Sequence, residues 1–220
     1  MNSLLGEKRQ RGNDMMKFFL LRDDMWLEKS SRRWMFGRFK HETVKANFEF
    51  VDPPVDYMEP CTYPIDLFRD GLQTDFSFTM DAGNIPILSE KARSALLGLP
   101  EIDEPYCHVV LEPIRIENKL VDQNYFVMII ETQLDCVDEE RSEFQKYEEN
   151  DPVRPDRAGD YRSFFNLVVD PSKIGDHHIF RLKKHLGSII VSEEVKRRFE
   201  AAGVTGAVFD SVNGDRKTVV

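Results

Sequence analysis

The most regular pattern of hydrophobic and polar positions lies near the C-terminal end, at residues 176–209. After two histidines, Phe180 and Leu182 alternate with Arg181 and Lys183. This alternation predicts a strand whose apolar pair points inward and whose basic pair points outward. Together with the runs that follow, it predicts the order strand, turn, strand, helix and strand.

The helix in this stretch is predicted to begin after Ser192. This serine follows a β-branched run in the position of an N-cap, where its hydroxyl can accept a hydrogen bond from a free helical N–H. Glu193 and Glu194 then lie in the first turn, where the helix dipole favours negative charge. Each is followed four residues later by an arginine, Arg197 and Arg198, so this face is expected to form ion pairs in solvent.

The opposite face of the same helix is apolar. Val195, Phe199 and Ala202 have the i, i+4 and i+7 spacing of a stripe that packs on a core. Gly203 suits the left-handed residue that ends a helix. A further strand is predicted at residues 204–209.

The rest of the chain alternates short apolar runs with turn signals. A second unit of strand, serine and helix is predicted where Ser89 follows residues 85–88 and precedes the stripe of Ala92, Leu96 and Leu99. The fold is therefore expected to use one supersecondary device twice. The other predicted strands cover residues 17–21, 47–51, 75–80, 106–111, 125–133 and 164–169, with a short helical turn at 66–71.

These elements predict an α+β fold with a mainly antiparallel or mixed β-sheet and a few short helices. The 220 residues suit one domain, which we assign to residues 16–212. Two subdomains divided near residue 120 are the alternative. Residues 1–15 are expected to be a disordered leader or a cloning remnant, and residues 213–220 a frayed tail.

Composition limits the classes of partner. A net charge of −9 with 31% charged residues predicts a soluble, acidic protein that does not bind nucleic acid and attracts basic partners. Cys61, Cys107 and Cys136 are odd in number and widely spaced, which disfavours a disulfide framework or a structural zinc site. No apolar run approaches the roughly 18 residues of a membrane span. The first residues lack the apolar region of a secretory signal. We therefore expect a cytoplasmic protein without membrane contact.

Two short motifs resemble catalytic ones. Asp176, His177 and His178 follow the order of metal-dependent phosphoesterases of the DHH type, but such sites need several further aspartates on separate strand ends. Polar residues at a strand entrance are the preferred interpretation. Cys107 and His108 are neighbours on a predicted strand, so they point to opposite faces and cannot act as nucleophile and base. We expect no catalytic residue, cofactor or metal, and no enzyme activity.

The most acidic part of the chain runs from Leu134 to Asp151. Residues 131–151 carry nine acids against Arg141 and Lys146. A charge run of this kind forms a solvated face more often than a recognition surface. Nothing in the spacing of its carboxylates indicates an acid of raised pKa beside an ionised base.

Three segments, residues 85–99, 125–144 and 164–209, carry a set of motifs in a fixed order. The most specific are Leu134-Asp-Cys-Val-Asp with Ser142, Ile179-Phe-Arg, Val191-Ser-Glu and Gly203-Val-Thr-Gly-Ala-Val-Phe. In this order they resemble Imm11, an immunity-protein family of bacterial polymorphic toxin systems. The resemblance covers roughly residues 16–210 and is looser over 23–74.

The resemblance implies a non-enzymatic antitoxin that is kept in the producing cell and its kin. Such a protein binds one cognate toxin domain and blocks its active site or the entry of its substrate. The toxins of these systems are often nucleases, so a nuclease is the expected target. The resemblance assigns no catalytic residue, and its motif residues are expected to be structural.

The acidic segment agrees with this implication, because an acidic inhibitor can mimic phosphate charge on a basic nuclease surface. We expect this segment to contribute to the toxin interface, with Phe144 and Tyr147 as apolar anchors. The candidate partner-binding residues are Asp138, Glu139, Glu140, Glu143, Phe144, Tyr147, Glu148, Glu149 and Asp151. Two alternatives remain: a metal-dependent hydrolase using Asp176, His177 and His178, and a partner-binding domain unrelated to toxins.

Overall fold

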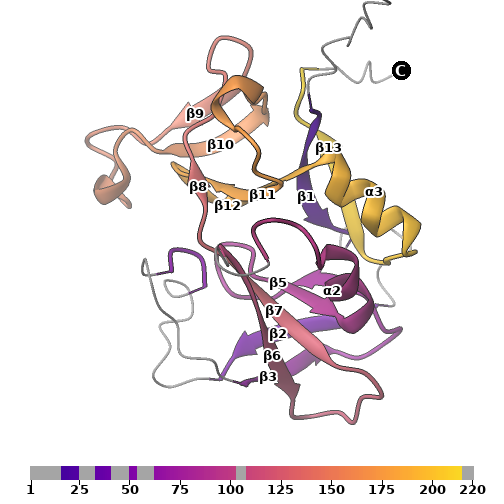
Figure 1. Ribbon diagram of the computed structural model, residues 1–220. Helices are drawn as coiled ribbons and strands as arrows, with labels where there is room; N and C mark the ends of the chain where they lie inside the picture. The colour runs from indigo at the N-terminus through magenta and orange to yellow at the C-terminus, as the bar shows by residue number, and fades with distance from the viewer. Residues whose placement is uncertain (1–15, 25–32, 41–49, 54–61, 103–107, 215–220) are drawn as a thin grey trace, which may run out of the picture.

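The described part of the chain forms a five-stranded sheet, a six-stranded sheet, a two-stranded arm and two short α-helices (Figure 1). The computed structural model describes residues 16–24, 33–40, 50–53, 62–102 and 108–214. The five-stranded sheet has the order β13 (Ala207–Ser211), β1 (Phe18–Asp23), β12 (His185–Ser192), β11 (Ile179–Leu182) and β8 (Gln133–Leu134). The six-stranded sheet has the order β2 (Met35–Phe39), β3 (Tyr63–Arg69), β6 (Val109–Ile116), β7 (Tyr125–Ile130), β5 (Pro86–Ser89) and β4 (Phe76–Phe78). The arm consists of β9 (Glu143–Lys146) and β10 (Tyr161–Asn166), and the helices are α2 (Glu90–Leu96) and α3 (Glu193–Ala201).

Both large sheets are mixed. Most strand pairs are antiparallel, whereas β3 pairs with β6, and β11 with β8, in parallel. Strand β1 lies between β12 and β13, so that Phe19 is opposite Val191 on one side and Ser211 on the other. The first and last described strands therefore share one sheet. This arrangement confirms the predicted α+β class with a mainly antiparallel or mixed sheet and few short helices.

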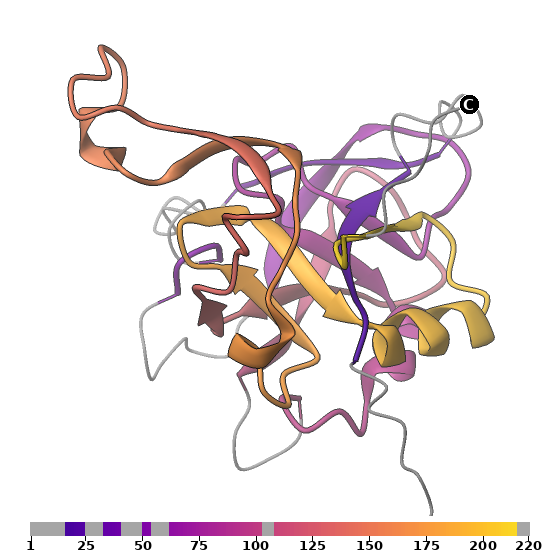
Figure 2. The same cartoon turned by 90° about the horizontal axis from the view of Figure 1, so that it is seen from above.

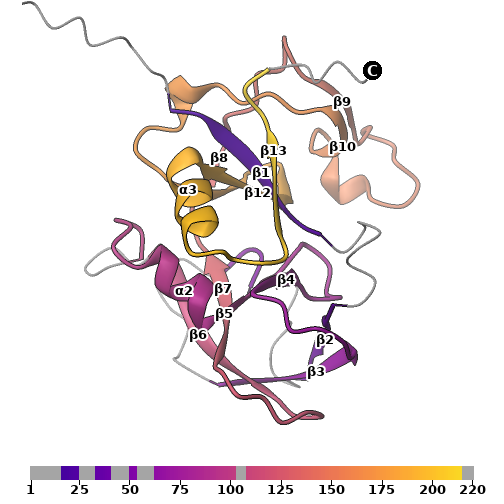
Figure 3. The ribbon, with the colours of Figure 1, turned by 90° about the vertical axis from the view of Figure 1, so that its right-hand side faces the viewer.

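The two predicted units of strand, serine and helix are both present, and their helices lie side by side (Figure 3). The Ser89 hydroxyl accepts a hydrogen bond from the Ala92 N–H at 3.3 Å, which is the predicted cap of α2. Ser192 precedes α3, but its hydroxyl makes no cap bond and lies 2.8 Å from Nδ1 of His178. Ser192 is therefore the N-cap residue, as predicted. The predicted hydrogen bond from a helical N–H to its hydroxyl is wrong, because the hydroxyl pairs with the imidazole of His178 instead.

The apolar face of α3 is largely as predicted. Val195 and Phe199 are each 1% exposed. Ala202 is exposed, since it lies beyond the last helical turn and no longer continues the stripe. Gly203 has a φ of +63°, the left-handed conformation predicted for the end of the helix.

The charged face of α3 pairs differently from the prediction. Glu194 accepts hydrogen bonds from both Arg197 and Arg198 at 2.7 Å. These bonds lower the pKa of Glu194 to about 2. The pair of Glu194 with Arg198 is confirmed, whereas the expected pair of Glu193 with Arg197 is wrong because Glu194 takes that arginine. Arg198 also donates to the Leu97 carbonyl at 2.8 Å and so links α3 to the end of α2.

Strand β3 replaces the helical turn predicted at residues 66–71. Tyr63, Ile65 and Leu67 alternate as buried residues along it, which is the pattern of a half-buried strand. Phe50, at the end of the strand predicted for residues 47–51, lies in a turn, and residues 47–49 are outside the described part of the chain.

Arg181 departs furthest from the pattern. It was predicted to point outward with Lys183, but it is 0% exposed, because β11 lies between β12 and β8 and is buried on both faces. Its guanidinium donates to the carbonyls of Gly83 at 2.9 Å and Asn84 at 3.1 Å in the turn between β4 and β5. It also donates to the Leu186 carbonyl of β12 at 2.5 Å. Arg181 thus ties the six-stranded sheet to the five-stranded sheet, and we call the contact between these sheets the seam.

Buried side chains fall into three groups in the described residues. One lies between the large sheets and includes Phe76 and Phe199, and a second belongs to the six-stranded sheet and includes Tyr125. A third includes Tyr161 and Phe180 and supports the root of the arm. Seen from above, the arm projects away from the rest of the molecule (Figure 2).

Residue 120 lies between β6 and β7, which pair with each other. The chain passes from the six-stranded to the five-stranded sheet between β7 and β8.

The side-chain amide of Asn213 donates to the Phe18 carbonyl at 3.0 Å and accepts from the Phe18 N–H at 2.9 Å. Residues 1–15 and 215–220 lie outside the described part. Within that part, no helix has the length and apolar character needed to cross a membrane.

Candidate functional site

The arm begins in the segment that follows β8. Cys136 and Val137 enter the third buried group, and the Asp138 N–H donates to the Val168 carbonyl at 2.9 Å. The Ser142 hydroxyl accepts from the Val168 N–H at 3.0 Å and donates to its carbonyl at 3.1 Å. Burial raises the pKa of the Cys136 thiol to about 12, so this cysteine is not a nucleophile. The motif that begins at Leu134 therefore shapes the entrance to the arm.

Aromatic side chains form the root of the arm. The ring centroids of Phe144 and Tyr161 are 5.1 Å apart, and those of Tyr161 and Phe164 are 4.7 Å apart. Phe164 also meets the imidazole of His185 at 5.4 Å. Burial, and secondarily the charge of Arg157, lowers the pKa of His185. Phe144, one of the two predicted apolar anchors, packs within this cluster and is half-buried.

A hollow of about 530 Å³ lies at the foot of the arm, and we call it the acidic hollow. Its charged lining residues are Asp135, Asp138, Glu139, Glu140, Asp170, Lys173 and Lys184. Lys184 pairs with Asp135 at 2.9 Å. Arg141 pairs with Asp138 at 2.6 Å and holds the pKa of that carboxyl below its ordinary value. The lining keeps an excess of acid, since it has five carboxylates and two lysines.

Glu139, which lines the acidic hollow, bonds to two residues at the root of the arm. Its carboxylate accepts from Lys146 at 2.8 Å and from the Tyr161 hydroxyl at 2.5 Å. Lys146, followed by Tyr161, lowers the pKa of Glu139, and burial raises the pKa of Tyr161. The Glu139 carboxylate therefore bonds within the protein, to Lys146 and Tyr161.

Asp151 has a similar role near the tip. It is 8% exposed and accepts from the N–H groups of Val153 at 2.9 Å and Arg154 at 2.8 Å. The Arg154 N–H, followed by that of Val153, lowers the pKa of Asp151. Arg162 adds an ion pair at 3.3 Å. Asp151 therefore uses its carboxylate to shape a turn.

Tyr147 is covered by cations. The guanidinium carbons of Arg157 and Arg162 lie 5.1 and 5.6 Å from its ring centroid. These distances are typical of cation–π contacts. Like Phe144, Tyr147 is used within the arm.

Three of the candidate acids stay exposed without an ion pair in the described residues, namely Glu140, Glu148 and Glu149. Glu143 is also exposed. Two apolar residues of the arm are exposed but were not among the predicted binding residues. Val153 is 77% exposed and Phe165 is 74% exposed. Phe165 had a signal, because it neighbours Phe164 on a strand and adjacent residues point to opposite faces.

The residues of the hydrolase alternative do not converge. Asp176 and His177 line a separate hollow, whereas the imidazole of His178 bonds to Ser192. In the part of the chain that the structure describes, no three His, Cys, Asp or Glu side chains are grouped to hold a metal ion. Cys107 lies outside the described residues.

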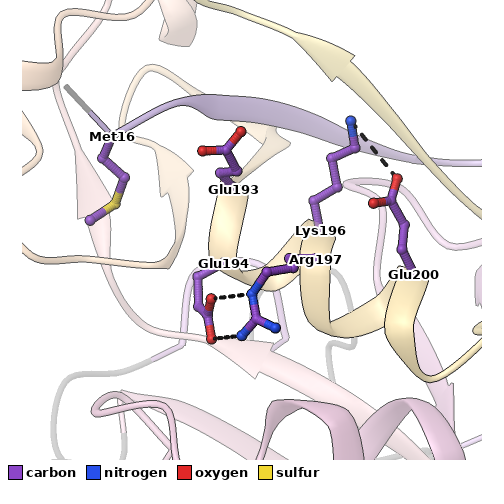
Figure 4. A pocket seen from close by; sticks show the side chains of 6 residues that line it. All are labelled: Met16, Glu193, Glu194, Lys196, Arg197 and Glu200. Atoms are coloured by element: carbon purple, nitrogen blue, oxygen red, sulfur yellow. Dashed lines mark hydrogen bonds and ion pairs between the residues drawn. The ribbon is translucent and has the colours of Figure 1, made fainter. Parts of the chain in front are cut away.

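A further hollow of about 420 Å³ lies beside α3 (Figure 4). Four of its five charged side chains form two pairs: Glu194 with Arg197 at 2.7 Å, and Lys196 with Glu200 at 3.9 Å. It therefore has the character of a solvated helix surface and offers no arrangement for chemistry.

Residues 112–214 match the model of the immunity protein family Imm11, which confirms the resemblance over this part of the chain. The match includes the arm, the acidic hollow and the whole stretch from β8 to β13, but not residues 85–99, where the sequence resemblance also extended. No curated protein matches the chain. The family match indicates an immunity protein, a class whose partner is a cognate toxin.

Proposed function

We propose that the protein is a cytoplasmic antitoxin of a polymorphic toxin system that binds one nuclease toxin and blocks access to its active site. The observation that supports this most directly is the arm, which projects from the body (Figure 2). Glu148 and Glu149 are exposed between its two strands, and Glu140 is exposed at its foot. A projecting acidic hairpin can enter a basic cleft that normally receives nucleic acid. The family match supports the antitoxin class, and the arm supplies the chemistry for a basic target.

Charge raises the association rate of such a complex. Exposed carboxylates steer a basic partner during diffusional encounter, and the association rate falls as salt screens the attraction. The three exposed acids suit this role because no cation in the described residues neutralises them. Asp138, Glu139 and Asp151 contribute indirectly by holding the shape of the arm.

An apolar contact is needed for a long-lived complex. We assign it to Phe165, whose ring is 74% exposed on β10 beside a hollow of about 480 Å³. Phe144 and Tyr147 support the strand pair instead. We therefore propose Phe165 as the main apolar anchor, in place of Phe144 and Tyr147.

A matched pair of charge reversals tests the interface. Glu148→Lys with Glu149→Lys changes the net charge by the same amount as Asp122→Lys with Glu200→Lys, but on different surfaces. We expect the arm variant to bind the toxin about tenfold or more weakly at low salt, with a smaller loss at high salt. The control should remain within about twofold of the wild type. Equal losses in both variants would show that net charge alone acts and would remove the arm from the interface.

The proposal predicts that a neighbouring gene encodes the toxin, and co-expression with that toxin domain tests the function itself. We expect survival of cells that carry both proteins, and co-purification of the two. Cell death despite a folded, abundant protein would rule out the antitoxin function, whatever the location of the interface. The hydrolase alternative predicts metal-dependent activity lost in His177→Ala with His178→Ala, whereas the antitoxin protects without such activity.

A further inference from the structure

A hollow of about 340 Å³ opens at the seam between the two large sheets. Pro100, Glu101 and His108 line it from the segments that flank β6 and α2, and Asp176 and His177 line it from the segment before β11. Neither the acidic arm nor the family motifs account for this group of side chains. The hollow lies on a different part of the molecule from the acidic hollow, with which it shares no lining residue.

Glu101 is the unusual member of the group. Its side chain is buried, with the residue 4% exposed, and Oε1 accepts hydrogen bonds from the N–H groups of His178 and, at 3.0 Å, Ile179. Its main-chain carbonyl accepts from the Val109 N–H at 2.9 Å. Oε2 is also buried, and it has no hydrogen-bond partner among the described residues. The carboxylate is thus held firmly by one oxygen, and the other is left unsatisfied.

A buried carboxylate oxygen without a donor is costly, and a ligand that supplies an N–H removes that cost. The other polar groups of the hollow fit a cation. Asp176 adds a second carboxylate, and His177 adds an imidazole with a flat face. The ring of His108 is placed by Glu131, with 3.7 Å between Nδ1 and Oε2. Among the described residues, no three His, Cys, Asp or Glu side chains are grouped to hold a metal ion, here or elsewhere.

We propose that this hollow binds an organic cation with N–H donors, a guanidinium or a primary ammonium group. Glu101 receives the donor through its unsatisfied oxygen, and Asp176 balances the charge at the rim. The ligand is either a free small molecule or an arginine or lysine side chain of a protein partner. This site does not depend on the proposed antitoxin function.

Titration of the full-length protein with methylguanidinium, and separately with propylammonium, tests the site. The readout is the imidazole resonances of His108 and His177 in NMR spectra. We expect saturable shifts in the wild type and a loss of affinity of about tenfold or more in Glu101→Gln, which removes one charge-assisted hydrogen bond. Gln can still accept the two amide bonds through its carbonyl. Glu200→Gln on α3, an exposed acid outside the hollow, is the matched control and should leave the affinity unchanged.

Asp176→Asn provides a second variant if Glu101→Gln does not fold. Asp176 is exposed, so its removal should weaken binding by a smaller factor, about threefold. Absence of saturable shifts with both probes, or equal affinity in the wild type and the Glu101 and Asp176 variants, would overturn the proposal. Stoichiometric binding of Zn²⁺ with the same dependence on Glu101 would also overturn it, in favour of a metal.

Addition of the purified toxin domain distinguishes the two sources of the cation. If a toxin side chain occupies the hollow, methylguanidinium and the toxin compete. If the ligand is a free small molecule, both bind together. Because the probe titration needs no toxin, failure of the site and failure of the antitoxin function are observed separately.

Discussion

The seam and the arm handle charge in opposite ways. At the seam, Arg181 and Glu101 are buried and bond to main-chain groups of the opposite sheet or segment. On the arm, Glu139 and Asp138 pair with cations near solvent, and Glu148 has no ion pair in the described residues. Buried charges with fixed acceptors hold one geometry, whereas exposed charges can change without disturbing the fold. The difference separates a region that specifies the structure from one suited to binding.

The seam has a second buried carboxylate with the same character. Asp75 accepts from the Thr205 N–H at 2.9 Å, the Ser89 hydroxyl at 2.9 Å and Lys91 at 2.7 Å. Burial alone would raise the pKa of Asp75, but the bonds from Lys91 and Thr205 outweigh burial and lower it. Asp75 therefore joins the start of β4, the cap of α2 and the loop after α3.

The largest expected effect is at Gly206 in the seam. Its φ is +95°, and a Cβ placed there would lie 2.1 Å from the carbonyl oxygen of Phe76. We expect Gly206→Ala to lower the free energy of unfolding by about 3 kcal/mol or more, because strain and a backbone clash add. Gly203→Ala is the control: Gly203 has a positive φ but nothing within 4 Å, so about 1 to 2 kcal/mol is expected. Urea unfolding measures both, and similar losses would contradict the close approach.

The next largest effect is expected at Arg181. Arg181→Met removes donors from three main-chain carbonyls, while it also relieves the buried charge, whose pKa burial lowers to about 9. The net loss should be about 2 to 3 kcal/mol. Arg22→Met, which breaks an exposed pair with Asp210 at 3.0 Å, should cost no more than about 1 kcal/mol. A stable Arg181→Met variant would show that the seam does not depend on this residue.

At the root of the arm, Tyr161→Phe removes the hydrogen bond to Glu139 and keeps the aromatic packing. A loss of about 1 to 2 kcal/mol in the free energy of unfolding is expected, since the bond is to a charged acceptor. Phe164→Leu would instead test the packing. If Tyr161→Phe leaves both stability and the arm's amide exchange unchanged, Glu139 does not hold the root.

A smaller effect is expected from pH. The folded state lowers the pKa of His185 below its ordinary value of 6.5, so below pH 6.5 the unfolded chain binds a proton more readily. Stability should therefore be full above pH 6.5 and fall as the pH decreases toward the folded pKa. His185→Asn should remove this slope between pH 7.5 and 5.5 in thermal unfolding. The lowered pKa values of Asp138, Glu139 and Asp151 affect stability only at lower pH, as pH falls below about 4.5.

The smallest change in stability is expected on the free acids of the arm. Glu148→Lys with Glu149→Lys should alter the free energy of unfolding by no more than about 0.5 kcal/mol, since both side chains are exposed and unpaired in the described chain. Toxin affinity should nevertheless fall, as proposed above. A large loss of stability would mean that these acids belong to the structural network and not to the binding surface.

The local sequence patterns predicted the helices and strands at the seam better than they predicted the contacts that its side chains make. Ser89, Val195 and Phe199 occupy the roles that their spacing indicated. Arg181 was wrongly predicted to point into solvent. The alternation of apolar and basic residues indicates the two faces of a strand, but it does not show whether both faces are covered in the fold. Ser192 was correctly placed at the helix start, but the partner of its hydroxyl was not predicted, because His178 is fourteen residues away in the sequence.

The candidate site was predicted as a segment but not residue by residue. Charge composition located the arm, because a dense acidic run is visible without a structure. It did not separate Glu140 from Glu139, since only the fold brings Lys146 and Tyr161 to one of them. The seam hollow was outside the reach of the sequence, because Glu101 and Asp176 are brought together by the packing of the two sheets.

The sequence by itself determined the mixed α+β class, the two helices with their serine starts, and the acidic character of one segment. These properties depend on the order of neighbouring residues, which periodicity and charge report directly. Only the tertiary structure decided which charges are buried, which acids are exposed without an ion pair in the described residues, and which apolar side chains of the arm are exposed. Those properties depend on contacts between residues far apart in the chain, and desolvation at such contacts determines whether a charged group stabilises the fold or stays available for a partner.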